Sequence, residues 1–278
     1  MAPIITLTSD FGLQDAYVGA MRGVLLGICP GAALADITHM VPAQDVVHGA
    51  WALRDAAPFF PAGAVHLAVV DPGVGGPRRA IIARAGGHLL VGPDNGLLVP
   101  AAEALGGVER AWQIDPGRLG ARAPRARSPS ATFHGRDIFA PAAGWLASGV
   151  DPEALGDAVE GLLPLPAPAP QVSLGRILGR IMTADHFGNL TTNVPASAIP
   201  DRARARVTLI DRAQPAIEGL SRTYGDAAVG QVMALAGSSG YIEIAVNQGS
   251  ARARLGADPG DAVEIALSFG DADVPDKP

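Results

Sequence analysis

A segment in which proline takes every second position divides this 278-residue sequence into two parts of different texture. Between residues 163 and 170, the prolines remove backbone donors and favour an extended chain, so this stretch is typical of a linker. We therefore expect an N-terminal domain over 1–162, a linker over 163–171, a C-terminal domain over 172–270 and a tail over 271–278.

The part before the linker alternates short apolar runs with stretches of helical spacing. Each run ends in turn residues such as Ser-Asp, Asp-Pro-Gly or Asp-Asn-Gly, which favours strands that lead into loops. The pattern predicts an α/β domain whose sheet is flanked by helices. The expected strands are 4–8, 34–37, 65–70, 81–84 and 89–91, and the expected helices are 15–28 and 44–56.

The part after the linker reads as a series of short strands with little helix between them. Turn residues separate these strands, which predicts a smaller β-barrel-like domain or a sandwich. The expected strands are 175–184, 206–210, 232–236, 241–246 and 262–267.

Composition and charge exclude several classes of protein. The formal net charge of -6 argues against a nucleic-acid surface, which needs clustered basic residues. Cys29 is the only cysteine and reads as a small core residue, so no internal disulfide can form. The first ten residues lack the basic region of a signal peptide, and no apolar stretch is long enough to span a bilayer. We expect a cytoplasmic protein with neither a membrane nor a nucleic acid as its partner.

Polar residues gather where the expected strands end. In open α/β sheets, ligands bind beyond the carboxyl ends of the strands, so these positions predict a small-molecule site. Asp before Gly or Pro is also common in turns, and each position taken alone could be a turn or a cap. The residues are Asp10, His39, Asp71, Asp94, Asn95, Thr132, Phe133 and His134.

Other kinds of site find less support in the sequence. Asp10, Asp15, Asp36 and His39 could hold a metal, but they lack the spacing of an HxxxH or CxxC motif, so we expect no metal and no cofactor. The chain has no G-x-S-x-G elbow for a nucleophilic serine and no glycine-rich phosphate loop.

Nearly the whole chain carries an ordered series of motifs. They are TSDFG at 8–12 with Asp15 and YVG at 17–19, DITH at 36–39, VVDPGVG at 69–75 with Arg78, PDNGLL at 93–98, TFHGRDIFAP at 132–141, DHFGNL at 185–190 and SSGY at 238–241 with Asn247. This series resembles the S-adenosylmethionine hydroxide adenosyltransferases, a family related to the enzymes that place fluoride or chloride on the same substrate.

The resemblance implies an enzyme that uses water to cleave S-adenosylmethionine into adenosine and methionine. It implies an α/β domain, a C-terminal barrel-like domain and a homotrimer whose sites lie at subunit interfaces. By position, Asp71, Arg78 and His134 match the family's residues for handling water, and we call them the water trio.

The resemblance also assigns residues to the substrate. Asp10 would hold the two ribose hydroxyls, Asp15, Asp185 and Ser238 would contact the methionine portion, and Asn189, Tyr224 and the backbone near Gln248 would contact the adenine. Phe133 and Ser239, within the shared motifs, complete the expected substrate-binding set.

The chemistry of the reaction suits these residue types. A sulfonium leaves as a neutral thioether, so the difficulty lies in preparing the water. A fixed positive charge such as Arg78 favours hydroxide, His134 can accept a proton and Asp71 can orient either partner. Which of the three accepts the proton stays open on the sequence alone.

The sequence leaves three alternatives to the hydrolase function open. A chlorinase is the nearest, although the anion at Asp71 would repel a halide, and Gly135 together with a missing insertion before residue 93 argues against a fluorinase. The others are a metal-dependent nucleotidase and a protein that binds S-adenosylmethionine or adenosine without turning it over.

Overall fold

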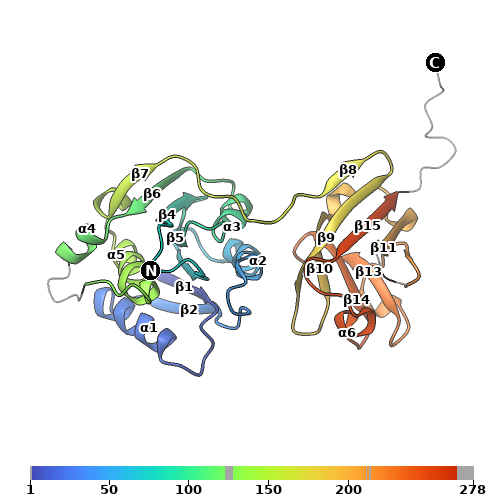
Figure 1. Cartoon of the computed structure of the whole chain (residues 1–278), viewed down its shortest axis with the longest axis horizontal. Coiled ribbons are helices and arrows are strands. Elements are labelled where there is room, and N and C mark those ends of the chain that lie inside the picture. The colour runs from blue at the N-terminus through green and yellow to red at the C-terminus, as the bar shows by residue number, and fades with distance from the viewer. Residues whose placement is uncertain (1, 123–127, 211, 213, 268–278) are drawn as a thin grey trace, which may run out of the picture. The chain divides into compact units, whose positions relative to one another are not determined.

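The structure is a computed structural model that describes residues 2–122, 128–210, 212 and 214–267. These residues form two compact units, and the division lies between Pro166 and Ala167 (Figure 1). The predicted tail over 271–278 lies outside the described residues. The predicted fold class, an α/β part followed by a smaller barrel-like part, is confirmed.

The N-terminal unit is built on a seven-stranded sheet in the order β2-β1-β3-β5-β4-β6-β7. Neighbouring strands from β2 to β5 run parallel, whereas β4, β6 and β7 add antiparallel pairs. The strands are β1 (Ile4–Ser9), β2 (Ala33–Thr38), β3 (Val65–Val69), β4 (Ala80–Ala85), β5 (His88–Pro93), β6 (Arg110–Ile114) and β7 (Gly156–Val159).

Helices cover both faces of this sheet. α5 packs against β1, β3 and α1 on one face, and α2 packs against β1, β2 and α3 on the other. The helices are α1 (Tyr17–Ile28), α2 (Val46–Ala56), α3 (Val99–Ala104), α4 (Pro116–Arg122) and α5 (Ala140–Ala147). In the part of the chain that the structure describes, no helix has both the length and the apolar character needed to cross a membrane.

The alternation of side chains along the central strands explains why both faces are apolar. On β4, Ile82 packs into the core beneath α1 and α5, whereas Ile81 and Ala83 pack into the core beneath α2 and α3. Successive side chains of a strand point to opposite faces, so a strand covered on both sides must be apolar throughout.

One expectation about the strand ends is wrong. Thr132, Phe133 and His134 do not follow a strand; they lead into a π-helical turn at Gly135–Phe139, which continues directly into α5. A turn of π-helix widens the backbone locally and is frequent at functional sites.

The C-terminal unit is a barrel-like sheet in the order β12-β11-β15-β9-β10-β14-β13, with β8 added to β9. β12 packs against β13, which brings the two ends of the sheet together. The elements are β8 (Gln171–Ser173), β9 (Arg176–Ala184), β10 (Leu190–Pro195), β11 (Ala205–Leu209), β12 (Ile217–Glu218), β13 (Val232–Ala236), β14 (Tyr241–Val246), α6 (Ala251–Leu255) and β15 (Ala262–Leu267).

Asp94, one of the predicted strand-end residues, anchors the start of the expected linker at Leu163. One carboxylate oxygen accepts from Nε of Arg79 at 2.7 Å, and the other accepts from the backbone N–H of Leu163 at 2.8 Å. Arg79 also donates to the carbonyl of Gly161 at 2.9 Å. The Asp94 side chain is only 2% exposed, and the positive charge of Arg79 compensates its negative charge. Asp94 is therefore a structural residue.

We predict that Asp94→Ala lowers the free energy of unfolding by about 3 kcal/mol, because it leaves Arg79 without its partner and the Leu163 N–H without an acceptor. Urea denaturation measures this loss. Asp115→Ala is the control: that carboxylate also accepts a backbone N–H, from Gly117, but is half exposed, so its loss should cost less than about 1 kcal/mol. Equal losses in the two variants would contradict the anchoring role.

Candidate functional site

A cavity of about 220 Å³ lies at the carboxyl ends of β1 and β3 in the N-terminal unit. Five of the predicted site residues line it, namely Asp10, Asp71, Thr132, Phe133 and His134. Asp10 directly follows β1, and Asp71 is separated from the end of β3 by Val70. The remaining lining residues are Phe11, Gln44, Val69, Pro72, Val74 and Gly135.

The structure brings Asp71, Arg78 and His134 into direct contact. The guanidinium of Arg78 donates through Nε to Oδ1 of Asp71 at 3.0 Å and through Nη2 to Oδ2 at 2.5 Å. The same Nη2 lies 2.7 Å from Nδ1 of His134. The side chains of Asp71 and Arg78 are 5% and 11% exposed, so the ion pair is largely shielded from solvent.

A glycine makes this meeting possible. The loop after β3 carries Asp71 and Arg78, and it passes against the backbone of Ala131 just before His134. Gly75 has a φ of 75°, and a Cβ there would collide with the carbonyl oxygen of Ala131. Only glycine readily adopts this positive φ and also leaves room for the Ala131 carbonyl, and this explains the second glycine of the VVDPGVG motif.

The contact with Arg78 determines the protonation of His134. Arginine can only donate, so Nδ1 of His134 must be the acceptor, and the proton of the neutral ring is on Nε2. Burial, together with the positive charge of Arg78, lowers the pKa of the His134 imidazole below its usual value. The trio is thus an anion, a cation and a neutral imidazole.

Asp10 is held by Gln44, a residue that the sequence analysis did not identify. The backbone N–H of Gln44 donates to Oδ2 of Asp10 at 2.8 Å. Gln44 has a φ of 67°, a left-handed conformation that is uncommon for a residue with a side chain and occurs often at functional sites. Nothing in the local sequence indicates this conformation.

Phe133 forms an aromatic wall, whereas Asp15 lies apart. The ring of Phe133 meets the rings of Phe11 and Tyr17 edge-to-face, at centroid distances of 5.8 and 5.0 Å. Asp15 is exposed in the loop before α1 and does not line the cavity. The expected contact of Asp15 with substrate therefore stays a prediction.

In the C-terminal unit, a cavity of about 470 Å³ contains four more of the predicted residues. Asp185, Asn189, Tyr224 and Gln248 line it together with Phe187, Val246 and Gly249. Oδ1 of Asp185 accepts from the backbone of Asn189 at 2.8 Å, and Oδ2 accepts from the Asn189 side-chain amide at 2.9 Å. Because a carboxylate can only accept, this bond fixes the orientation of the Asn189 amide and leaves its carbonyl oxygen available as an acceptor.

Tyr224 is fixed by Glu243, a second residue that the sequence analysis missed. The Tyr224 hydroxyl donates to Oε1 of Glu243 at 2.7 Å, and burial followed by the charge of Asp185 raises the pKa of the Glu243 carboxyl. A lone acid within the apolar strand β14 was the signal that could have identified it. The predicted residues Ser238 and Ser239 lie in the turn between β13 and β14 and do not line the cavity.

The hypothetical metal site finds no support in the described residues, which contain no group of three or more His, Cys, Asp or Glu side chains placed to hold a metal ion. His39 and Asp36 do lie together, with 3.2 Å between Nε2 of His39 and Oδ1 of Asp36. Asp10 is instead oriented by Gln44, and Asp15 is exposed.

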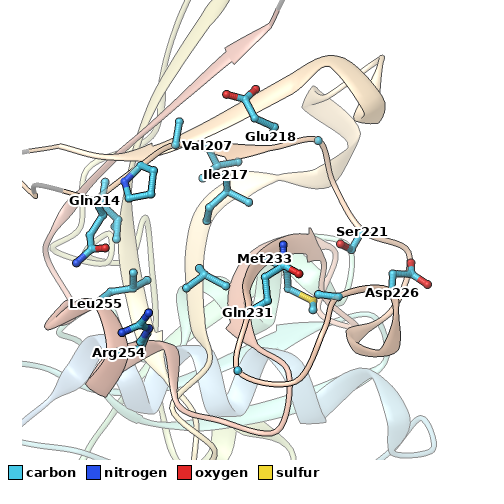
Figure 2. Close-up of a pocket in the computed structure, with 17 residues that line it drawn as sticks. Val207, Gln214, Ile217, Glu218, Ser221, Asp226, Gln231, Met233, Arg254 and Leu255 are labelled. Atoms are coloured by element: carbon cyan, nitrogen blue, oxygen red, sulfur yellow. The ribbon is translucent and has the colours of Figure 1, made fainter.

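A larger cavity of about 510 Å³ in the C-terminal unit contains none of the predicted residues (Figure 2). The carboxylates of Glu218 and Asp226 at its rim point away from its centre, as Figure 2 shows. Glu218 pairs with Arg206 at 3.0 Å, and Asp226 accepts from the backbone of Arg222 at 2.8 Å. Both carboxylates are therefore engaged in local structure.

Comparisons with known proteins agree with the ordered motifs. Family models described as the SAM hydroxide adenosyltransferase N-terminal and C-terminal domains match residues 5–156 and 179–264. A protein of Salinispora arenicola named (R)-S-adenosyl-L-methionine hydrolase is 44% identical, with 95% of this chain and 97% of the relative covered. A fluorinase of an Actinoplanes species is 27% identical, with 88% and 91% covered. A crystal structure of an uncharacterized conserved protein from Thermotoga maritima matches with a TM-score of 0.84 at 34% identity, covering 95% of this chain and 99% of that one.

We predict that Arg78→Gln raises the pKa of the His134 imidazole, because the positive charge that disfavours its protonation is removed. NMR titration of the histidine ring resonances measures the shift, with His48 on α2 as an internal reference in the same samples. An unchanged or lowered His134 pKa in the variant would show that Arg78 does not control this imidazole.

Proposed function

The chain belongs to the SAM hydroxide adenosyltransferase family, and we propose that it hydrolyses S-adenosyl-L-methionine to adenosine and L-methionine. The contact among Asp71, Arg78 and His134 at a cavity carries this proposal. Full-length relatives named (R)-S-adenosyl-L-methionine hydrolase support the choice of substrate and of water as the nucleophile.

The proposed reaction is a displacement at the ribose 5′ carbon. A water oxygen forms a bond to C5′, the bond from C5′ to the sulfonium sulfur breaks, and its electron pair stays on sulfur. Methionine leaves as a neutral thioether without help from an acid, and the water loses one proton. The protein therefore has two tasks: to hold the water in line with the breaking bond and to accept its proton.

The water trio divides these tasks by protonation state. Nδ1 of His134 already accepts from Arg78, so its Nε2–H is left to donate to the water and orient it. Asp71 is the anion of the trio, and a carboxylate retains lone pairs after accepting from Arg78. We therefore assign proton acceptance to Asp71, and to Arg78 the positive charge that stabilises the developing hydroxide.

The remaining residues are proposed to recognise the substrate. Asp10, held by Gln44, would accept both ribose hydroxyls, and Phe133 would pack against the ribose side of the cavity. In the C-terminal unit, the free carbonyl oxygen of Asn189 suits the amino group of adenine, and Tyr224 offers a ring face. Asp15, Asp185 and Ser238 would contact the methionine portion, and the backbone near Gln248 would contact the adenine edge. Ser239 would complete the substrate-binding set.

We further propose that the enzyme works as a cytoplasmic homotrimer, in which the N-terminal unit of one subunit and the C-terminal unit of the next serve the same substrate. Each unit taken alone carries only part of the expected substrate-binding set, which supports this proposal.

Water is favoured over a halide as the nucleophile by the residues around the cavity. Asp71 places a negative charge where a halide would have to approach. Gly135 has no side chain that could donate, and a Cβ there would come within 3.1 Å of Met21 and 3.2 Å of Phe11. The charge of Asp71 argues against both halogenase alternatives, whereas Gly135 argues only against a fluorinase.

We predict that the purified chain releases adenosine and methionine from S-adenosylmethionine in halide-free buffer, with activity that survives a chelator. Chromatography of the products tests this. A sulfonium with three different substituents is a stereocentre, so the (R) and (S) epimers are assayed separately. Formation of mainly 5′-chloro-5′-deoxyadenosine after addition of chloride would assign a chlorinase, loss of activity with a chelator would favour a nucleotidase, and binding without turnover would indicate a sensor.

We predict that Asp71→Asn lowers kcat by about 10²–10⁴-fold, the usual contribution of a general base, while KM changes little. Steady-state kinetics measure both constants. Asp94→Asn is the matched control, since it removes the carboxylate partner of the neighbouring Arg79 and should cost stability rather than turnover. Full activity in the Asp71 variant, or an equal loss of kcat in both, would remove Asp71 from the chemistry.

A further inference from the structure

A buried chain of polar side chains links β1 to the end of β2 in the N-terminal unit. Oγ of Ser9 lies 2.7 Å from Nδ1 of His39, and Nε2 of His39 lies 3.2 Å from Oδ1 of Asp36. Arg22 on α1 pairs with the other oxygen of Asp36. Ser9 is 0% exposed and His39 is 3% exposed, so the chain runs from the interior to the half-exposed Asp36.

These residues have the order of a Ser-His-Asp triad, but the geometry excludes nucleophilic catalysis. The Ser9 hydroxyl is completely buried at the end of β1, between β2 and β3, where no substrate can reach it. Burial lowers the pKa of His39, which favours a neutral ring. On the neutral ring, Nδ1 can accept from the Ser9 hydroxyl, which leaves Nε2–H in an electrostatic contact with Asp36 that lacks hydrogen-bond geometry. The Ser9 oxygen can in turn accept from a backbone N–H.

That backbone N–H belongs to the loop that carries Asp10. The N–H of Phe11 donates to Oγ of Ser9 at 3.4 Å, and the N–H of Gly12 donates to the carbonyl oxygen of His39 at 2.8 Å. Ser9 itself precedes Asp10, and the two residues after Asp10 bond to Ser9 and His39. The backbone on both sides of Asp10 is therefore held by this pair. The Asp10 carboxylate itself is turned toward Gln44 and the cavity.

We propose that Ser9 and His39 are positioning residues that hold the Asp10 loop so that the carboxylate meets both ribose hydroxyls. The proposal rests on the proposed function in one respect, the contact of Asp10 with the ribose. Accepting from two neighbouring hydroxyls at once requires a fixed carboxylate, because each hydrogen bond weakens steeply as its angle departs from linear. The buried chain supplies that rigidity from behind the loop.

The same strand provides a matched control. Thr6, three residues earlier on β1, is also 0% exposed, and its hydroxyl lies 2.8 Å from Nδ1 of His66. His66 in turn lies 3.1 Å from Nδ1 of His88 on β5. Thr6→Val and Ser9→Ala therefore each remove one buried hydroxyl-to-imidazole hydrogen bond from β1, but only Ser9 contacts the Asp10 loop.

The test compares the binding of adenosine and 2′-deoxyadenosine to the full chain by calorimetry. We expect the wild type to prefer adenosine, and Ser9→Ala to reduce this preference by about fivefold to tenfold, roughly the contribution of one hydrogen bond. Thr6→Val should keep the wild-type preference. Asp36→Asn, at the solvent end of the chain, should reduce it to a smaller extent and serves if Ser9→Ala does not fold.

Each outcome decides the proposal. If Ser9→Ala keeps the wild-type preference for adenosine, the proposal is overturned, and the same holds for Asp36→Asn if only that variant folds. An equal loss of this preference in Thr6→Val would indicate a general effect on β1 and would also overturn the proposal. A wild type without any preference overturns the role of Asp10 and the proposal together. Adenosine release in the product assay with an unchanged ratio in Ser9→Ala would leave the hydrolase function standing and reject only the positioning role.

Discussion

The guanidinium of Arg78 joins the carboxylate of Asp71 to the imidazole of His134, and the N-terminal site is arranged around this contact. A single Nη2 nitrogen reaches both partners, so the positions of the anion and the neutral ring are linked. The ion pair is shielded from solvent, and breaking it by removing one partner would leave an uncompensated buried charge. Such a pair stays in place without substrate, and the water it would bind meets a preformed environment.

The contrast between two adjacent arginines shows that residue type alone does not make a site. Arg78 pairs with Asp71 beside an open cavity, whereas Arg79 pairs with Asp94 and donates a hydrogen bond to the carbonyl oxygen of Gly161. Both pairs place an arginine on a buried carboxylate, and the two arginines are neighbours in sequence. The free space next to Asp71 is what distinguishes chemistry from structural support.

Both units place negative charge beside the cavity that carries their predicted residues. Asp10 and Asp71 line one cavity, and Asp185 lines the other with Glu243 close behind it. This arrangement suits a substrate that carries a cationic sulfonium and a cationic ammonium group, because opposite charges in a partly shielded cavity attract more strongly than in water. It also disfavours a free halide as the attacking group.

The sequence by itself determined the two kinds of sheet and most of the strands, because a short apolar run that ends in turn residues marks a strand, and this local pattern needs no knowledge of the fold. Family motifs also identified the members of the trio, although their contact lies between segments 56 residues apart. Polar strands were not predicted; β10 is an example, because its sequence LTTNVP has no alternation of apolar residues. Only the tertiary structure decided that Asp94 is an anchor, that Gln44 orients Asp10 and that Ser9 meets His39. A hydrogen bond between distant segments depends on where the backbone brings them, and local patterns of hydrophobicity contain no information about that distance.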